Sequence, residues 1–408
     1  MIRHFYIDNF KSLVDFSLPP KPQHLGKFTC LIGMNGTGKS TVLQALDFVK
    51  QLAHGRFDDW LTAREWDKSD LTSRFTRKQL INFRLVFELD NLGIINWEGQ
   101  FNPILLRCTS ETVYLEDKEL LRLTDGDVRY DAEEEKKRFI ARELQFQGSV
   151  FSALKLKRAH PAIRAVRDCL RDMKSLDMLS PNLMRKRTRD AEDVGYGGER
   201  LSAFLHRYST HTKRTLLDIL KGFYPQVQSV ETSSLRGGWK SLKVAEAFGT
   251  QCFSVNARQL NDGMLRILAI VSQVEAKDQW KRSPNDIRET AKILGKSVHR
   301  EYKMLLFDEI ENGIHPELIE KLMAYLLDAE QQIIVTTHSP MILNYLPDDV
   351  AKEAVILLYR TEEGITRSVR YFDLPSTQKK LKLLGPGEVF VDTDLPGLTF
   401  EAERLRGA

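Results

Sequence analysis

A glycine-rich turn, Gly33-Met34-Asn35-Gly36-Thr37-Gly38-Lys39-Ser40, constrains this 408-residue chain more than any other segment. It follows the apolar run Phe28–Ile32 and precedes the amphipathic segment Ser40–Lys50. It therefore matches GxxxxGK[ST] between a strand and a helix, which is the context that this motif requires. Glycines let the backbone wrap closely, so that its N–H groups point at phosphate oxygens, and the helix N-terminus adds a favourable dipole. The pattern predicts a phosphate-binding loop rather than a chance glycine-rich turn.

The residue types in this loop also predict what each does. The Lys39 ammonium would reach the β- and γ-phosphates of a nucleotide, and the Ser40 hydroxyl would bind Mg²⁺. The expected nucleotide contacts are Asn35, Gly36, Thr37, Gly38, Lys39, Ser40 and Thr41.

Two acidic residues end a second apolar run, Met304–Phe307. A carboxylate at the end of a buried strand is unfavourable unless it faces a cation or hydrogen-bond donors, and ligands bind where parallel strands end. We expect Asp308 to hold Mg²⁺ and Glu309 to orient the attacking water. Glu311 could be a supporting acid or simply exposed, and the sequence leaves both interpretations open.

A histidine and a polar loop are two further candidates for contacts with a phosphate. His338 comes after the apolar run Ile333–Thr336, so it could contact the γ-phosphate, or it could cap the helix that starts at Ser339-Pro340. Asn261-Asp262-Gly263 opens another helix, where glycine and N–H groups favour an anion, although Asn261 or Asp262 could equally be an ordinary N-cap.

In their order along the chain, the four segments resemble those of the ABC-type ATPases of the RecF, SMC and OLD group, which belong to the broadly defined AAA ATPases. GMNGTGKST is similar to their Walker A motif, QLNDGMLR to their signature motif, LLFDEIENGIHP to Walker B with the D-loop, and TTHSP to the H-loop. The opening IRHFYIDNFKSL is similar to the first strands of that group.

The resemblance implies an α/β fold: a P-loop NTPase with an ABC-type mixed sheet, an antiparallel β subdomain beside a parallel core, and an inserted helical lobe. It also implies that two copies sandwich ATP and Mg²⁺. The phosphate loop of each copy would face Asn261, Asp262 and Gly263 of the other. The segment Asn312 to Pro316 would lie at the seam.

The chain also departs from the family pattern. Asn261 replaces the usual serine, although asparagine is still a hydrogen-bond donor. Gln147 is a weak candidate for the Q-loop glutamine. About 70 residues follow His338, too few for the nuclease domain of OLD proteins. The nearby acids Glu388, Asp392 and Asp394 are therefore expected to form an exposed acidic surface.

The expected domain organisation has four parts. Residues 1–135 form the N-terminal part of the ATPase core, 136–224 a helical insertion, 225–373 the C-terminal part of the core, and 374–408 a polar tail. Within them, the charge run Asp131–Arg138 predicts a solvated helix start.

Composition sets the outer limits. The formal charge is +4, which neither favours nor excludes nucleic acid. The four cysteines lie far apart without a CxxC pair, so we expect buried free thiols in a reducing compartment. No apolar run approaches the roughly 20 residues that cross a bilayer, which predicts a cytoplasmic protein with no membrane contact.

Three functional hypotheses follow. The favoured one is the ATPase or sensor subunit of a bacterial, anti-phage defence system that acts with a separate nuclease or toxin effector. The alternative is a RecF-like DNA-binding maintenance protein, in which Arg185–Arg189 with Lys155, Lys157 and Arg158 contact phosphates; a solvated helix face would explain the same residues. A transporter subunit is disfavoured because QLNDGM stands where such proteins have LSGGQ.

Overall fold

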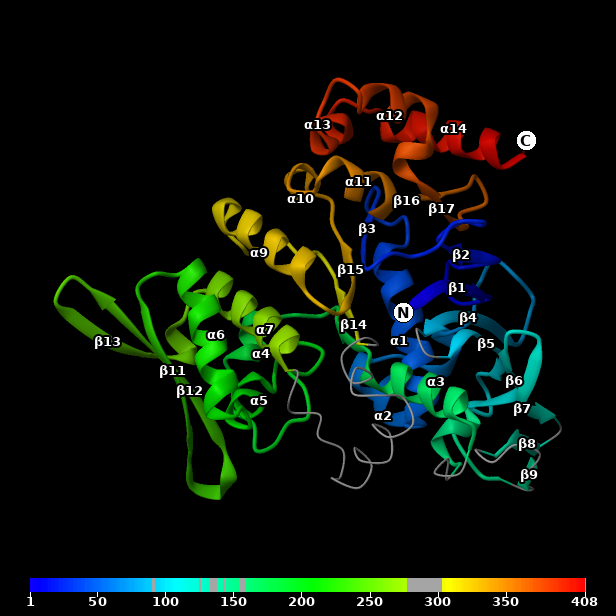
Figure 1. Cartoon of the computed structure of the whole chain (residues 1–408), viewed down its shortest axis with the longest axis horizontal. Coiled ribbons are helices and arrows are strands. Elements are labelled where there is room, and N and C mark those ends of the chain that lie inside the picture. Colours follow the sequence, from blue (N-terminus) through cyan, green and yellow to red (C-terminus); the bar gives the residue numbers. More distant parts are fainter. Residues whose placement is uncertain are drawn as a thin grey trace.

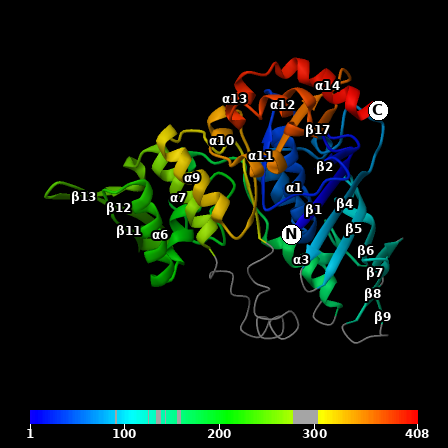
Figure 2. The same ribbon diagram turned by 45° about the horizontal axis from the view of Figure 1, so that its top comes forward.

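The computed structural model describes residues 1–89, 92–124, 126–132, 138–141, 144–154, 159–276 and 303–407. Two sheets form the body of the molecule, an eight-stranded antiparallel one and a six-stranded mostly parallel one. A helical lobe projects to one side of them (Figures 1 and 2). This is the predicted P-loop NTPase architecture of the ABC type, with an antiparallel β subdomain, a parallel core and a helical lobe.

The antiparallel sheet has one buried face. In β4, alternate residues from Ile81 to Leu89 are buried, which is the period-2 pattern of a strand that faces a core on one side. Its strands, in spatial order, are β2 (Phe16–Leu18), β1 (Ile2–Asp8), β4 (Ile81–Leu89), β5 (Gly93–Asn102), β6 (Arg107–Leu115), β7 (Lys118–Thr124), β8 (Asp127–Asp131) and β9 (Arg138–Ala141).

The second sheet carries the predicted motifs. Its strands, in spatial order, are β10 (Lys174–Leu176), β14 (Met304–Phe307), β15 (Gln332–Thr336), β3 (Phe28–Ile32), β16 (Val355–Arg360) and β17 (Thr366–Arg370). The first five are parallel, and β17 is antiparallel to β16. Every residue of β3, β14 and β15 is buried, as expected for strands covered on both faces.

Helices cover both faces of this parallel sheet. The side chains on its two faces belong to two different hydrophobic cores. Cys30 and Ile32 point into the core on the side of the helical lobe, whereas Leu31 points into the core shared with the antiparallel sheet. The helices of that shared core are α1 (Lys39–His54), α2 (Phe57–Arg64) and α3 (Pro161–Asp172). The opposite side has α9 (Pro316–Asp328), α10 (Pro340–Asn344), α11 (Asp348–Ala354), α12 (Pro375–Lys380), α13 (Pro386–Val391) and α14 (Leu395–Gly407).

The projecting lobe combines helices with a small sheet. Its helices are α4 (Pro181–Met184), α5 (Leu201–His206), α6 (Thr210–Phe223) and α7 (Asp262–Glu275). Its antiparallel strands are β11 (Val227–Ser234), β12 (Lys240–Phe248) and β13 (Gln251–Asn256). In both views the lobe lies across β14, β15 and α9 from α1 (Figures 1 and 2).

Two expected segments differ from the structure. Residues 136–224 are not uniformly helical, because they contain β9 and also β10, whose pairing with β14 makes it an edge strand of the core sheet. The last 35 residues are not a polar tail: they form α12, α13 and α14 and bury Val389, Leu398 and Ala402. The sequence pattern did not indicate these helices because they bury few apolar side chains; in α12 the buried residue is Thr377.

Other expectations concern single features. Glu388 and Asp394 accept backbone N–H groups at helix starts, from Gly385 and Gly397, and Asp392 pairs with Lys380 at 3.0 Å. Three of the free cysteines are buried, but Cys252 is exposed on β13. Residues 133–137 of the charge run lie outside the described residues. Among the residues that are described, no helix is both long and apolar enough for a bilayer crossing.

Candidate nucleotide-binding site

The glycine-rich turn joins β3 to α1 as predicted. Gly38, directly before α1, has φ 103°, a left-handed conformation that favours glycine, and a β-carbon there would meet the Thr366 hydroxyl at 2.5 Å. The Thr366 Oγ1 donates to the carbonyl of Thr37 at 2.9 Å, and the Thr366 N–H donates to the carbonyl of Ser12 at 3.0 Å. The first residue of β17 therefore fixes the loop from outside.

Lys39 lies across this turn. Its Nζ donates to the carbonyl oxygens of Gly33 at 2.7 Å and Met34 at 3.1 Å. Burial lowers the pKa of Lys39, whereas Asp308, Glu309 and Glu311 act in the opposite direction. The ammonium is thus held inside the loop, within the electrostatic reach of the acids that end β14.

The Ser40 hydroxyl and the Asp308 carboxylate meet at the end of β14. They are hydrogen-bonded to each other, and the Thr336 hydroxyl donates to Asp308 Oδ1. Burial raises the pKa of Asp308, and Asp177 at the end of β10 raises it further, whereas the two hydroxyls lower it. The protein itself therefore stabilises the negative charge of the Asp308 carboxylate only weakly.

These residues fit a magnesium ion. A buried carboxylate beside a serine hydroxyl, at the N-terminus of a 16-residue helix, offers the oxygen ligands that Mg²⁺ takes together with phosphate oxygens. Among the described residues no cluster of three or more His, Cys, Asp or Glu side chains forms a metal site of its own.

Glu309 and His338 face each other beyond Asp308. Glu309 has φ 46°, an unusual backbone conformation for a residue other than glycine, and its N–H donates to Thr336 Oγ1 at 2.8 Å. Its Oε1 lies 4.0 Å from His338 Nδ1, and both side chains are nearly half exposed. The helix α10 has Ser339 as its N-cap, so His338 is not the capping residue.

Glu311 supports the histidine rather than standing free in solvent. Its Oε1 accepts the Thr337 hydroxyl at 2.8 Å and the His338 N–H at 3.1 Å, while Oε2 is buried without a partner in the described part of the chain. The structure therefore favours the supporting role of the two that the sequence left open.

The loop Asn261-Asp262-Gly263 begins α7 on the helical lobe. Asn261 is the N-cap, and its side chain accepts the Met264 N–H at 2.8 Å, so the capping interpretation holds for Asn261. A β-carbon on Gly263 would lie 3.1 Å from the carbonyl oxygen of Gly313. The loop thus packs beside the turn after Glu309, and the core strands separate its helix from α1 (Figure 1).

Residues 28–344 match the family described as "AAA domain, putative AbiEii toxin, Type IV TA system". The chain belongs to this AAA domain family. The match spans all four motifs and confirms the resemblance to ABC-type P-loop proteins that these motifs predicted. No curated protein matches the chain.

Solved structures that are similar to this AAA protein include three heads of SMC proteins. An SmcHead bound to the C-winged helix domain of ScpA is 15% identical, with TM-score 0.49, covering 94% of this chain and 99% of that one. The SMC head domain from Thermotoga maritima is 11% identical, with TM-score 0.46 and coverage of 90% and 98%. An Smc head with an extended coiled coil bound to the C-terminal domain of ScpA, from Pyrococcus furiosus, is 11% identical, with TM-score 0.49 and coverage of 93% and 99%.

Gln147, the weak Q-loop candidate, lies elsewhere in this AAA protein. Its side chain accepts the Phe57 N–H at 3.1 Å and donates to Asp58 at 2.6 Å, so it caps α2. That helix follows the C-terminal end of α1, whereas the phosphate loop is at the N-terminal end. Gln147 is therefore not part of the site.

Two residues of the basic stretch Arg185–Arg189 make contacts within the protein. Arg185 Nη2 donates to Asp262 Oδ1 at 2.6 Å and to the Leu260 carbonyl at 2.8 Å, so it braces the loop before α7. Arg189 lies over the ring of Trp239 at 4.9 Å. Lys155, Lys157 and Arg158, the other proposed phosphate contacts, lie outside the described residues.

A cavity of about 510 Å³, which the sequence did not predict, lies beside the phosphate loop. It is bordered by Ser12 and Thr41, by the aromatic rings of Trp66 and Phe75, and by Lys11. The Lys11 Nζ lies 3.2 Å from the centre of the Trp66 ring, and burial lowers the pKa of Lys11 to about 8. Trp66 and Phe75 lie outside every motif in the sequence, so only the fold could show that they meet Thr41 at one cavity.

Proposed function

We propose that this protein hydrolyses ATP, with Mg²⁺, at composite sites that form when two copies meet head to tail. One observation carries the proposal: Lys39, Ser40, Asp308, Glu309 and His338, separated by up to about 300 residues, converge at one edge of the parallel sheet. Their order in space is that of phosphate-binding, metal-binding and water-activating groups.

Each residue has a task in this mechanism. The backbone N–H groups from Asn35 to Thr41 and the Lys39 ammonium bind the β- and γ-phosphates. Bound to Ser40 and Asp308, Mg²⁺ would neutralise the charge that develops on the phosphates. Glu309 orients a water molecule for attack on the γ-phosphate and accepts its proton. His338, held by Glu311, contacts the γ-phosphate and distinguishes ATP from ADP.

The cavity beside the loop supplies room for the rest of the nucleotide. It borders Thr41 at the start of α1, where the phosphates would bind, and its size is within the range of small-molecule pockets. We infer that the nucleoside part enters this cavity.

A second copy would complete the site. The loop Asn261-Asp262-Gly263 lies on the helical lobe, across the core strands from α1 of its own chain (Figures 1 and 2). In the proposed dimer this loop would face the γ-phosphate bound by the partner, and residues 312–316 would lie at the seam. ATP would then favour the closed dimer and ADP the open one, which makes hydrolysis a conformational switch.

Subunit mixing tests this arrangement. Lys39→Ala and Gly263→Val should each abolish phosphate release from MgATP. A mixture of the two inactive proteins should regain activity, because a mixed dimer holds one site with an intact phosphate loop and an intact partner loop. If the mixture stayed inactive while each variant still paired with wild-type protein, the composite site would be wrong.

The cellular role is a further step of the same proposal. We propose a cytoplasmic ATPase or sensor subunit of an anti-phage defence system, which acts with a separate nuclease or toxin. The family description, which names an abortive-infection toxin, supports this direction. Co-purification with the product of the adjacent gene tests it. Loss of that product with ADP but retention with ATP would support a switched effector, and no retention in either state would contradict it.

A further inference from the structure

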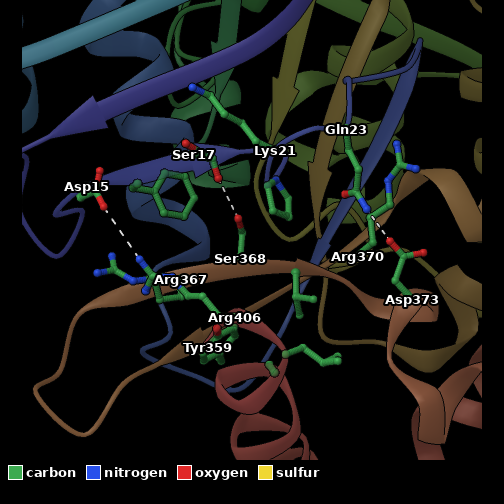
Figure 3. A pocket seen from close by; sticks show the side chains of 15 residues that line it. Asp15, Ser17, Lys21, Gln23, Tyr359, Arg367, Ser368, Arg370, Asp373 and Arg406 are labelled. Atoms are coloured by element: carbon green, nitrogen blue, oxygen red, sulfur yellow. Dashed lines mark hydrogen bonds and ion pairs between the residues drawn. The ribbon is translucent and has the colours of Figure 1, made fainter. Parts of the chain in front are cut away.

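A second cavity, of about 500 Å³, lies away from the phosphate loop, between β2, β17 and the C-terminal helix α14. Figure 3 shows its polar side chains in two groups, Asp15, Arg367 and Arg406 at one end of the view and Gln23, Arg370 and Asp373 at the other. Four of the residues that line it are cationic, Lys21, Arg367, Arg370 and Arg406, and two are acidic, Asp15 and Asp373. The lining thus carries an excess of two positive charges.

The acids compensate this charge only weakly. Asp15 Oδ2 lies 3.8 Å from Arg406, and both side chains are about half exposed, so solvent screens the pair. Asp373 accepts a hydrogen bond from Gln23. Glu403 accepts a hydrogen bond from Tyr359 and keeps its negative charge, so it offsets part of the charge of the nearby Arg367.

The arginines also retain free donor capacity. In the part of the chain that the structure describes, Nε of Arg367 and Nε of Arg370 are buried without an acceptor. Arg367 and Arg406 lie side by side in Figure 3, close enough that Arg406 adds to burial in lowering the pKa of Arg367. Two neighbouring guanidinium groups favour the binding of an anion that can accept hydrogen bonds from both of them.

The volume of the cavity and the residues that line it indicate which class of anion could bind there. Its volume is that of a small-molecule pocket rather than of a protein groove. A phosphate monoester carries about −1.5 to −2 charges at pH 7, which matches the excess of the lining. Pro20, Val369 and Leu405 provide apolar surface for an organic group attached to the phosphate.

The cavity is connected to the phosphate loop through one strand. Arg367 follows Thr366, the residue whose hydroxyl holds the Thr37 carbonyl. Ser368, the next residue, donates to the Ser17 carbonyl at 2.7 Å across the cavity (Figure 3). A shift of β17 on ligand binding would therefore reach the phosphate loop directly.

We propose that this cavity binds a small phosphate monoester, held by the neighbouring Arg367 and Arg406, and that its occupancy alters nucleotide binding through Thr366. The binding part does not depend on ATP hydrolysis. The coupling part rests on the proposed nucleotide site.

Calorimetry on the full-length Lys39→Ala protein tests binding, because the phosphate loop is disabled there. The probes are 5′-AMP, 5′-GMP, ribose 5-phosphate and inorganic phosphate. We expect at least one probe to bind with a Kd below about 1 mM. Adding Arg406→Gln should weaken that binding by about tenfold or more, since a hydrogen bond to a charged group is lost. Arg404→Gln, on the same helix but outside the lining, is the matched control and should leave Kd unchanged.

Two results would overturn the site: no saturable binding of any probe, or equal binding by the parent and Arg406→Gln proteins with unchanged melting temperatures. Coupling is measured in the wild-type chain as the Kd of ATP with and without the bound probe. Reciprocity requires the two ligands to shift each other's affinity by the same factor. An unchanged Kd of ATP would overturn the coupling. Failure of ATP hydrolysis alone would affect neither binding result.

Discussion

The N–H of Glu309 donates to the Oγ1 of Thr336 at 2.8 Å, and the same hydroxyl donates to Asp308. One threonine at the end of β15 therefore fixes both acids that end the neighbouring strand β14. The left-handed backbone at Glu309 is held in place by this contact.

Thr336→Val tests that contact, because valine keeps the shape and removes the hydroxyl. We expect the affinity for Mg²⁺ in the presence of ATP to fall by about 10- to 100-fold, as when partners of metal ligands are removed. The unfolding free energy should fall by about 1–3 kcal/mol. Metal titration and urea unfolding measure the two effects. Thr215→Val, a partly exposed change on α6, is the control, and an unchanged metal affinity would contradict the role of Thr336.

Glu309→Gln should stop turnover while ATP still binds. The amide keeps the size of the side chain but cannot accept a proton, so hydrolysis should slow by about 10²- to 10⁴-fold. Light scattering should then show a dimer that persists with MgATP. Glu320→Gln, an exposed change on α9, should behave as wild type. Normal turnover by the Glu309 variant would assign water activation to another residue.

Arg185→Gln separates two roles of the basic stretch. Because Arg185 binds Asp262, its loss should loosen the loop before α7 and slow ATP turnover by roughly three- to tenfold, corresponding to about 1 kcal/mol. Affinity for duplex DNA should not change. The neighbouring exposed Arg187→Gln is the matched control. If DNA binding fell and turnover did not, the RecF-like alternative would gain support.

Arg64 stands between two buried acids and should be critical for stability. Its guanidinium binds Asp47 at 2.6 Å and Asp177 at 2.8 Å, and each of these three side chains is at most 2% exposed. Arg64→Met should lower the unfolding free energy by about 3–5 kcal/mol, because among the described residues it leaves Asp177 without a cationic partner and Asp47 with Lys50 alone. The double variant that adds Asp177→Asn should recover part of this loss in urea unfolding. A double variant less stable than Arg64→Met would contradict the explanation.

Glu111 should make stability depend on pH. It is fully buried in β6, and burial raises its pKa from 4.5 to about 7 despite hydrogen bonds from Ser149, Val150 and Trp97. A carboxyl whose pKa is higher in the folded state stabilises the fold below pH 4.5, and this contribution is lost as pH rises through about 7.

Glu111→Gln should remove that dependence. Between pH 4.5 and 8 the wild type should lose on the order of 3 kcal/mol more than the variant in urea unfolding. Glu98→Gln, a partly exposed change on β5, is the control. Parallel pH profiles for wild type and Glu111→Gln would show that the carboxyl is not protonated in the fold.

The sequence by itself determined the strands and the chemistry next to them. Phe28–Ile32 and Met304–Phe307 are strands with the predicted bounds, because a buried apolar run followed by a motif of fixed geometry has few alternatives. Phosphate and magnesium demand particular donors at particular spacings, so the sequence could also predict that Lys39, Ser40 and Asp308 lie together, and their role in binding stays a prediction.

Only the tertiary structure decided what depends on contacts between distant segments. Thr336, Thr366 and Arg64 act through partners that no local pattern indicates, and Gln147 proved to be a helix cap. The strand Lys174–Leu176 is too short for a periodic signal and exists because β14 offers it an edge. The helices after residue 374 form because burial against the core, rather than local propensity, supplies most of their stability.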